Sequence, residues 1–134
     1  AMLGRTLGAW RLTERIAVGG MGVVYRAERV DGLFEQEVAV KLIRGEHVTP
    51  TTVRRFEVER STLAGLAHPG IARLFDGGTS ADGHPYLVME LVRGVPIDRH
   101  CRERDLSVVA RLRLFVEVCR AVHFAHQNLI VHRD

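Results

Sequence analysis

The run Val38-Ala39-Val40-Lys41 is the feature that most restricts what this chain can fold into. Its apolar, largely β-branched residues predict a buried strand, yet the run ends on a lysine. The chain has 19 lysine and arginine residues, and Lys41 is its only lysine. An ammonium group beside a buried strand needs an anionic partner. The compact ammonium of a lysine also suits a phosphate site into which the planar guanidinium of an arginine would not fit.

Short strands separated by turn signals fill the part of the chain around Lys41. Three strands are expected first, over 10–17, 22–29 and 36–43. The gaps between them are hairpin-sized, so they should form an antiparallel meander. Two more strands are expected, over 71–76 and 86–92, with the turn signal Asp82-Gly83 between them.

A helix is expected between the third and fourth strands, over 51–67. Thr49 is a suitable N-cap, and Pro50 follows at the first helical position. Five strands and one inserted helix make a small α+β unit that ends near Val92. We expect Glu59 on this helix to pair with Lys41. Glu57 is the rival partner, but it should point away from the side of the helix that carries Phe56.

The last third of the chain is predicted to be helical. A short helix is expected over 96–102, and Ser107 should cap a long helix that reaches about Gln127. Apolar residues cover most of the circumference of this long helix, which is typical of a helix inside a larger core. Since only residues 128–134 follow, we expect self-association through the exposed 107–127 helix.

A glycine turn precedes the lysine strand. Between two predicted strands, the backbone amides of Gly19, Gly20 and Gly22 could lie over phosphates, where side chains would block the approach. The turn is not a Walker loop, because no Gly-Lys-Ser/Thr follows it. Glycine-rich hairpins are common, so a purely structural turn stays open at this point.

Composition and charge exclude several classes of function. The net charge of +3 is small and acidic residues are interspersed with the arginines, so no nucleic-acid partner is expected. No apolar run is long enough to span a membrane, and no signal peptide is recognisable. The spacing of Cys101 and Cys119 indicates neither a disulfide framework nor a zinc site, and we expect no metal ligands in this chain.

Several motifs in order resemble the catalytic domain of serine/threonine protein kinases, most of all the eukaryotic-like kinases of bacteria. They are the glycine turn, Val38 to Lys41, Phe56-x-x-Glu59, His68-Pro69, Tyr86 to Glu90, and Val131-His132-Arg133-Asp134. The resemblance covers the N-terminal half of such a domain. It implies a tag or disordered lead over 1–8, a kinase N-lobe over 9–92, and a hinge with the first two helices of a truncated C-lobe over 93–134.

The resemblance also implies roles for single residues. Lys41, oriented by Glu59, would hold the α- and β-phosphates of ATP, and Asp134 would be the base that accepts the substrate hydroxyl proton. The other residues implied to bind the nucleotide are Ile16, Gly19, Gly20, Gly22, Val24, Ala39, the gatekeeper Met89, Glu90 and Val92.

Two departures from the family pattern bear on activity. Ala17 replaces the first glycine of the loop, which should perturb nucleotide binding only modestly. The residues that hold Mg²⁺ in the family are missing from these 134 residues, so we expect the chain alone to be inactive.

The parent protein is expected to phosphorylate Ser/Thr hydroxyls of a protein substrate in the cytoplasm, with any membrane anchor outside this chain. The alternative is a truncated pseudokinase-like module that acts by association through the 107–127 helix.

Overall fold

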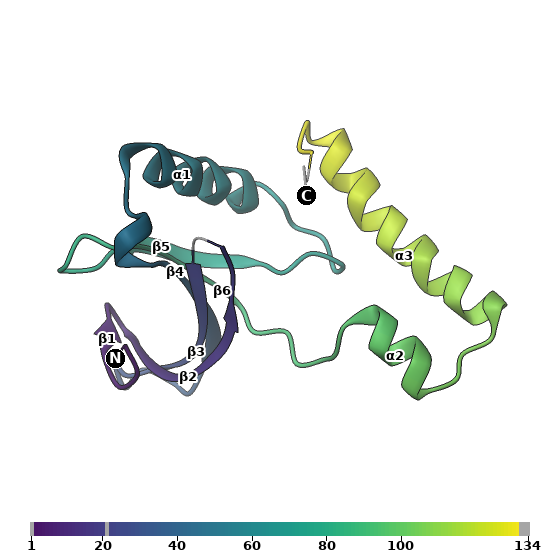
Figure 1. Cartoon of the computed structure of the whole chain (residues 1–134), viewed down its shortest axis with the longest axis horizontal. Coiled ribbons are helices and arrows are strands. Elements are labelled where there is room, and N and C mark those ends of the chain that lie inside the picture. The colour runs from purple at the N-terminus through teal and green to yellow at the C-terminus, as the bar shows by residue number, and fades with distance from the viewer. Residues whose placement is uncertain (1, 21, 132–134) are drawn as a thin grey trace. The chain divides into compact units, whose positions relative to one another are not determined.

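The computed structural model describes residues 2–20 and 22–131 (Figure 1). The chain divides into two compact units. The first comprises Ala1–Gly65 and Arg73–Leu91, and the second comprises Leu66–Ala72 and Val92–Asp134. Among the described helices, none combines the length and the apolar character needed to cross a membrane.

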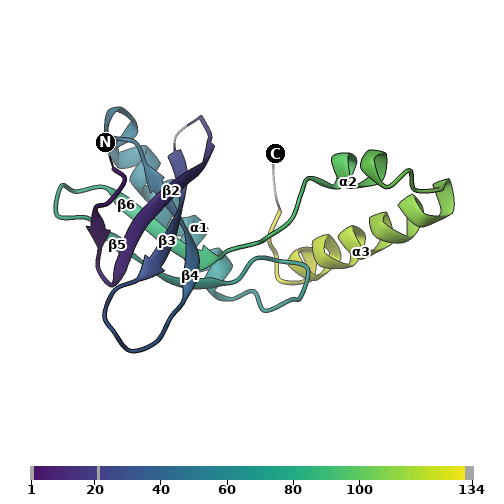
Figure 2. The same cartoon turned by 90° about the horizontal axis from the view of Figure 1, so that it is seen from below.

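A curled antiparallel sheet of six strands forms the frame of the first unit (Figures 1 and 2). The strands are β1 (Thr6–Leu7), β2 (Trp10–Val18), β3 (Gly22–Arg29), β4 (Glu37–Ile43), β5 (Leu74–Thr79) and β6 (Pro85–Glu90). Their order in the sheet is β1-β2-β3-β4-β6-β5. The strand that carries the only lysine, β4, therefore lies inside the sheet, paired with β3 on one side and β6 on the other.

The two faces of β4 are both covered, because successive side chains of a strand point to opposite faces. Val38, Val40 and Leu42 belong to the larger core cluster. That cluster also contains Leu7, Trp10, Leu12, Val23, Tyr25, Ala27 and Val88. Ile43 faces the other way and packs with Phe56 and Leu87 in a smaller cluster. Residue 41 falls on the same side of the strand as Ile43.

The helix α1 (Pro50–Ala64) covers that second face and begins with strong local signals. Thr49 and Thr52 form a reciprocal capping box, and Pro50 occupies the first helical position. A short 3₁₀ turn, η1 (Gly45–His47), precedes the helix. Phe56 is the one buried residue of α1, so this ring is the main anchor of the helix on the sheet.

Two helices make up most of the second unit. They are α2 (Ile97–Glu103) and α3 (Val108–Gln127). The Ser107 hydroxyl accepts a hydrogen bond from the Ala110 amide at 3.1 Å, as expected of the predicted N-cap. Ala121 is the one residue of α3 that is buried. The large apolar residues of α3 that are exposed are Val108, Val109, Leu112, Phe115, Val116, Val118 and Val122.

The predicted α+β architecture is confirmed, and so are the positions of the first three strands and of the long helix. The strand predicted over 71–76 is displaced, because β5 starts at Leu74 and continues to Thr79. The predicted strand ends at Asp76, whereas Gly77 and Gly78 continue β5 at the edge of the sheet and pair with Leu87 and Tyr86. A Cβ at Gly77 would lie 2.8 Å from Cδ of Arg60, a flexible side chain of α1, and 3.3 Å from the carbonyl oxygen of Tyr86.

The strand count was wrong by one, because β1 adds a sixth strand within the segment 1–8. A tag or disordered lead was expected there. Instead Leu7 is 3% exposed and joins the larger core cluster, so burial of its side chain holds the segment against the sheet. Arg5 adds an ion pair to Asp82 in the β5–β6 turn, with an Nη2–Oδ2 distance of 2.6 Å.

We predict that Phe56→Ala destabilises the protein by about 3 kcal/mol, because it removes a buried ring and leaves a cavity between α1 and the sheet. Val58→Ala on the same helix is the matched control, since Val58 is 59% exposed, and it should change the free energy of unfolding by less than about 0.5 kcal/mol. Urea unfolding measures both variants. Equal effects of the two would mean that Phe56 does not anchor the helix.

Candidate functional site

An ion pair between β4 and α1 joins two of the predicted site residues. Lys41 Nζ lies 3.1 Å from Glu59 Oε1 and 3.4 Å from Oε2, so the ammonium donates to both carboxylate oxygens. The two side chains are 37% and 38% exposed. A pair this open to water contributes at most about 1 kcal/mol to stability. Its main effect is therefore to fix the direction of the ammonium group.

The surrounding sheet explains why this pair forms. Lys41 is flanked across the sheet by Val24 on β3 and Leu87 on β6. Phe56, one turn before Glu59 on α1, packs against the same face of the sheet and brings Glu59 toward the lysine. Glu57, the rival partner, is exposed. The position of Glu59 thus follows from the apolar contact of its neighbour on the helix.

The glycine turn closes the hairpin between β2 and β3. The Gly19 amide donates to the Gly22 carbonyl at 2.8 Å. A Cβ at Gly22 would lie 2.8 Å from the carbonyl oxygen of Leu42, so this glycine is required by close packing of β3 on β4. Apart from its two chain neighbours, no described residue places an atom within 4 Å of a Cβ built at Gly20. Packing of the sheet therefore requires glycine at position 22, whereas the turn is open beside Gly20.

The sheet places several of the predicted adenine contacts around the lysine. Ala39 precedes Lys41 by two residues on β4 and pairs with Met89 on β6. Ala39 is buried, whereas Val24 and Met89 are partly buried. Ile16 on β2 and Glu90 at the end of β6 are exposed and lie in the same unit. The Glu90 amide donates to the Arg73 carbonyl at 2.7 Å.

Two predicted site residues are not among these residues of the first unit. Val92 belongs to the second unit and is largely exposed. Asp134, the predicted base, lies outside the described residues together with His132 and Arg133.

Carboxylates with lowered pKa values lie at turns of the first unit. The pKa of Asp82 is lowered mainly because the Arg5 guanidinium donates a hydrogen bond to it. The pKa of Asp31 is lowered mainly by a hydrogen bond from Arg29, whose guanidinium also lies over the rings of Trp10 and Phe34. The first pair joins the N-terminal segment to the β5–β6 turn, and the second joins the end of β3 to the β3–β4 loop.

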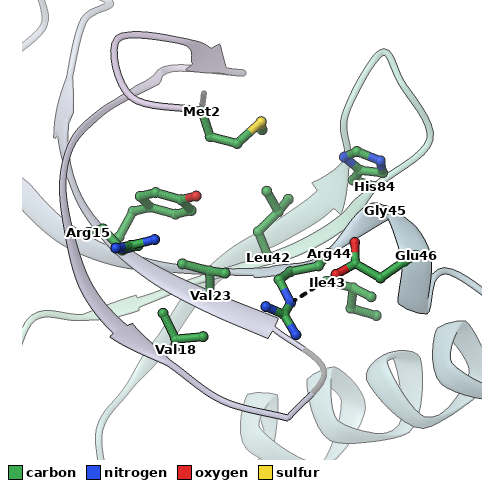
Figure 3. Close-up of a pocket in the computed structure, with 11 residues that line it drawn as sticks. Met2, Arg15, Val18, Val23, Leu42, Ile43, Arg44, Gly45, Glu46 and His84 are labelled. Carbon is green, nitrogen blue, oxygen red and sulfur yellow. Dashed lines mark ion pairs between the residues drawn. The ribbon is translucent and has the colours of Figure 1, made fainter.

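The first unit contains a pocket of about 270 Å³, the Arg44 pocket, that is not predicted from the sequence (Figure 3). Its lining consists of Met2, Arg15, Val18, Val23, Tyr25, Leu42, Ile43, Arg44, Gly45, Glu46 and His84. These residues come from the N-terminal segment, three strands, the turn before α1 and the β5–β6 turn. No local spacing in the sequence predicts such a set, because it assembles only when the sheet curls.

The first unit is a curled antiparallel sheet with one helix, α1, packed on it. An inner strand of the sheet carries Lys41, which bonds to Glu59 on α1. These features define a kinase-like α+β domain. Comparison with known families agrees, since residues 10–134 match the model described as "Protein kinase domain". The chain therefore belongs to the protein kinase family.

Individual relatives are bacterial serine/threonine protein kinases. The chain is 41% identical over 133 residues to PknA of Mycobacterium tuberculosis, covering 95% of the chain and 30% of PknA. It is 34% identical over 132 residues to PrkC of Bacillus subtilis, covering 97% of the chain and 20% of PrkC. The crystal structure of the Mycobacterium tuberculosis PknI kinase domain matches with a TM-score of 0.77 and 28% identity, covering 98% of the chain and 53% of that domain. The chain thus spans less than a third of these curated relatives and about half of a solved kinase domain.

We predict that Gly22→Ala destabilises the protein by about 1–3 kcal/mol, because the added methyl group would press on the Leu42 carbonyl. Gly20→Ala is the matched control in the same turn, and it should change stability by less than about 1 kcal/mol since nothing lies near its Cβ. Chemical denaturation of both variants gives the comparison. If Gly22→Ala were as stable as Gly20→Ala, the sheet would not be what requires glycine at position 22.

Proposed function

We propose that this chain is the ATP-binding half of a serine/threonine protein kinase, whose complete form transfers the γ-phosphoryl group of ATP to Ser/Thr hydroxyls of proteins. The observation that carries the proposal is the Lys41–Glu59 pair beside the glycine hairpin. The names of PknA and PrkC, both serine/threonine protein kinases, support the same assignment.

Lys41 supplies the positive charge that the α- and β-phosphates need. Its ammonium has three donors, two of them directed at the oxygens of Glu59. More than a third of the Lys41 side chain remains exposed, so a phosphate oxygen can approach while Glu59 keeps the ammonium in place. Electrostatic groups held in advance of the reaction stabilise the transition state more than mobile ones do.

The glycine hairpin would lie over the phosphates. The open side of the turn at Gly20 leaves room for backbone amides to approach an anion. Gly19 would contribute its backbone in the same way. Gly22 acts indirectly, because its missing side chain lets β3 and β4 approach closely enough to hold the hairpin over Lys41. Ala17, in place of the first glycine of the family pattern, would weaken nucleotide binding only slightly.

The adenine ring would lie among the apolar residues beside Lys41. Val24 and Ala39 would pack on its two faces, Met89 would stand at the back of the site, and Ile16 would contribute from β2. The Glu90 amide already bonds to Arg73, so we expect recognition of adenine by the Glu90 carbonyl rather than by its amide. The backbone of Val92 would provide the further hydrogen bond.

The chemical step needs a base and a metal ion in addition to Lys41. Asp134 would accept the proton of the substrate hydroxyl as that oxygen forms its bond to the γ-phosphorus, while the bond to the bridging oxygen breaks and ADP leaves with the electron pair. Mg²⁺, when bound with ATP, neutralises charge on the phosphates. The described residues include no group of three or more metal-ligating side chains. Because the metal-binding residues of the family pattern are not among these 134 residues, we propose that the chain binds nucleotide but does not catalyse transfer alone. We also propose that the complete kinase works in the cytoplasm, where ATP is supplied.

We predict that Lys41→Ala in the full-length protein that carries this chain lowers kcat by at least about 10²-fold, because charge stabilisation of the phosphates is lost. Glu59→Gln should lower kcat about 10-fold to 10²-fold, since the lysine is then only loosely oriented. Glu57→Gln is the matched control on the same helix and should retain full activity. The assay is transfer of phosphate from labelled ATP to a protein substrate.

Circular dichroism spectra should show that all three variants keep the fold. Near-normal turnover of Lys41→Ala would refute the assignment of the site. Equal losses for the Glu57 and Glu59 variants would show that the ion pair has no specific role.

A second candidate function rests on the exposed apolar side of α3. Seven of its large apolar residues, from Val108 to Val122, remain exposed. In the kinase reading the rest of the catalytic domain covers this side, since the chain spans about half of a solved kinase domain. In the second reading the chain is a pseudokinase-like module and a second copy covers it. A downstream reading frame with Lys-x-x-Asn and Asp-Phe-Gly favours the kinase, and a stop codon favours the module.

We predict that the 134-residue chain by itself forms dimers or larger species at micromolar concentration, because α3 exposes an apolar surface. Phe115→Glu should restore the monomer by placing a charge in that surface. Arg113→Glu, also exposed on α3, is the matched control and should leave the association unchanged. Multi-angle light scattering measures the mass. A clean monomer of the unaltered chain would rule out association through α3.

A further inference from the structure

The N-terminal segment 2–7 bonds to β2, the strand that leads into the glycine hairpin. Its short strand, β1, pairs with β2 over two residues. Backbone hydrogen bonds extend this pairing, because the Gly4 amide donates to the Leu12 carbonyl at 2.8 Å and the Leu12 amide donates to the Arg5 carbonyl at 2.9 Å. The segment therefore gives β2 a second row of backbone hydrogen bonds as far as Leu12.

Beyond Leu12, β2 has a neighbouring strand on one side only. Among the described strands, β3 alone pairs with residues 13–18, and register shifts interrupt that ladder. These residues are all exposed, and a strand with exposed hydrogen bonds opens more easily than one inside a sheet. The other strand of the hairpin is held firmly, since Val23 of β3 is buried and pairs with Leu42 of β4. The order of the β2 side of the hairpin thus depends on its attachment near Leu12.

Two anchors of unequal strength hold the segment. Leu7 is buried in the larger core cluster. Arg5 holds the other end, because its Nη2 lies 2.6 Å from Asp82 Oδ2 and its Nη1 lies 3.3 Å from Met2 Sδ. The side chains of the Arg5–Asp82 pair are 42% and 51% exposed, so this ion pair shifts an equilibrium about fivefold at most. Residues 2–5 can therefore detach while Leu7 stays buried.

The detachable residues lie beside the glycine hairpin. Met2 packs against the larger core cluster and lines the Arg44 pocket together with Val18 and Val23, which flank the glycine turn. Figure 3 shows Met2 on one side of this pocket and Val18 and Val23 on the other. Release of residues 2–5 would remove this wall of the pocket as well as the hydrogen bonds at Leu12.

We propose that the N-terminal segment 2–7 is a strap that holds the glycine hairpin against the sheet, and that release of the strap at Arg5 loosens the hairpin. An attached strap keeps the amides of the hairpin in place, whereas a released strap makes them more mobile and weakens their hold on an anion. The effect on nucleotide binding rests on the proposed function. The coupling between the strap and the hairpin does not.

Amide hydrogen exchange of the full-length protein tests the coupling in the variant Arg5→Ala. The Leu12 amide reports release of the strap, and the Gly19 amide, which donates to the Gly22 carbonyl at 2.8 Å, reports opening of the hairpin. Both should exchange about threefold to fivefold faster, the range expected for loss of an exposed ion pair. The amide of the buried Val88 on β6 reports global unfolding and should change less than the Gly19 amide.

Arg11→Ala is the matched control, because it removes an ion pair with Glu28 from the same strand, and the two side chains are 50% and 47% exposed. It should leave exchange of the Gly19 amide unchanged. Asp82→Ala removes the partner of Arg5 and should reproduce the effect of Arg5→Ala, with little further effect in the double variant. Faster exchange at Leu12 without faster exchange at Gly19, or equal acceleration at Gly19 by Arg11→Ala, would overturn the proposal.

Titration with a fluorescent ATP analogue tests the consequence for the site. Arg5→Ala should weaken binding about twofold to fivefold, and Arg11→Ala should leave it unchanged. An unchanged affinity in Arg5→Ala, with the analogue bound by the unaltered protein, would overturn the role of the strap at the nucleotide site. No binding by the unaltered protein would instead refute the proposed function, since the exchange experiment tests the strap without any nucleotide.

Discussion

The alternation of side chains along β4 is the constraint on which the rest of the structure depends. One strand inside the sheet sends Val38, Val40 and Leu42 into the larger core cluster and keeps Lys41 and Ile43 on the face covered by α1. Burial of the apolar residues on both faces fixes the register of β4 against β3 and β6. A slip by one residue would place the ammonium in the larger core cluster, whose described members include no carboxylate.

The energetics of the site follow from this arrangement. The Lys41–Glu59 pair is too exposed to stabilise the fold by much. The position of Glu59 is instead set by the buried ring of Phe56 one turn earlier on α1. Apolar packing thus provides the stability, and the ion pair provides the direction of one ammonium group. This division suits a phosphate site, because the charge is held before any ligand binds.

In the second unit, the apolar side of α3 is exposed. Residues 108–127 form the helix that the sequence predicts, yet Ala121 is the only one of them that is buried. Local signals such as the Ser107 cap are enough to define the helix. Its apolar side needs further partners, which is consistent with a chain that spans about half of a solved kinase domain.

By itself, the sequence determined the strands and helices that short local motifs define. It also determined the Lys41–Glu59 pair, whose two residues lie on consecutive elements of the chain. Short strand-like runs separated by turn signals specified β2 to β4. The Thr49-Pro50 start specified α1, and the Ser107 cap specified the long helix. The single lysine on a buried strand, with Glu59 on the next helix, specified the candidate site. Only the tertiary structure decided the remainder: β1, the start of β5, the reason for glycine at position 22, and the Arg44 pocket. Each of these depends on contacts between residues far apart in the chain, such as Gly22 with Leu42 or Arg5 with Asp82. Such contacts form only when β3 pairs with β4, or when the N-terminal segment reaches the β5–β6 turn, so no spacing along the chain can reveal them.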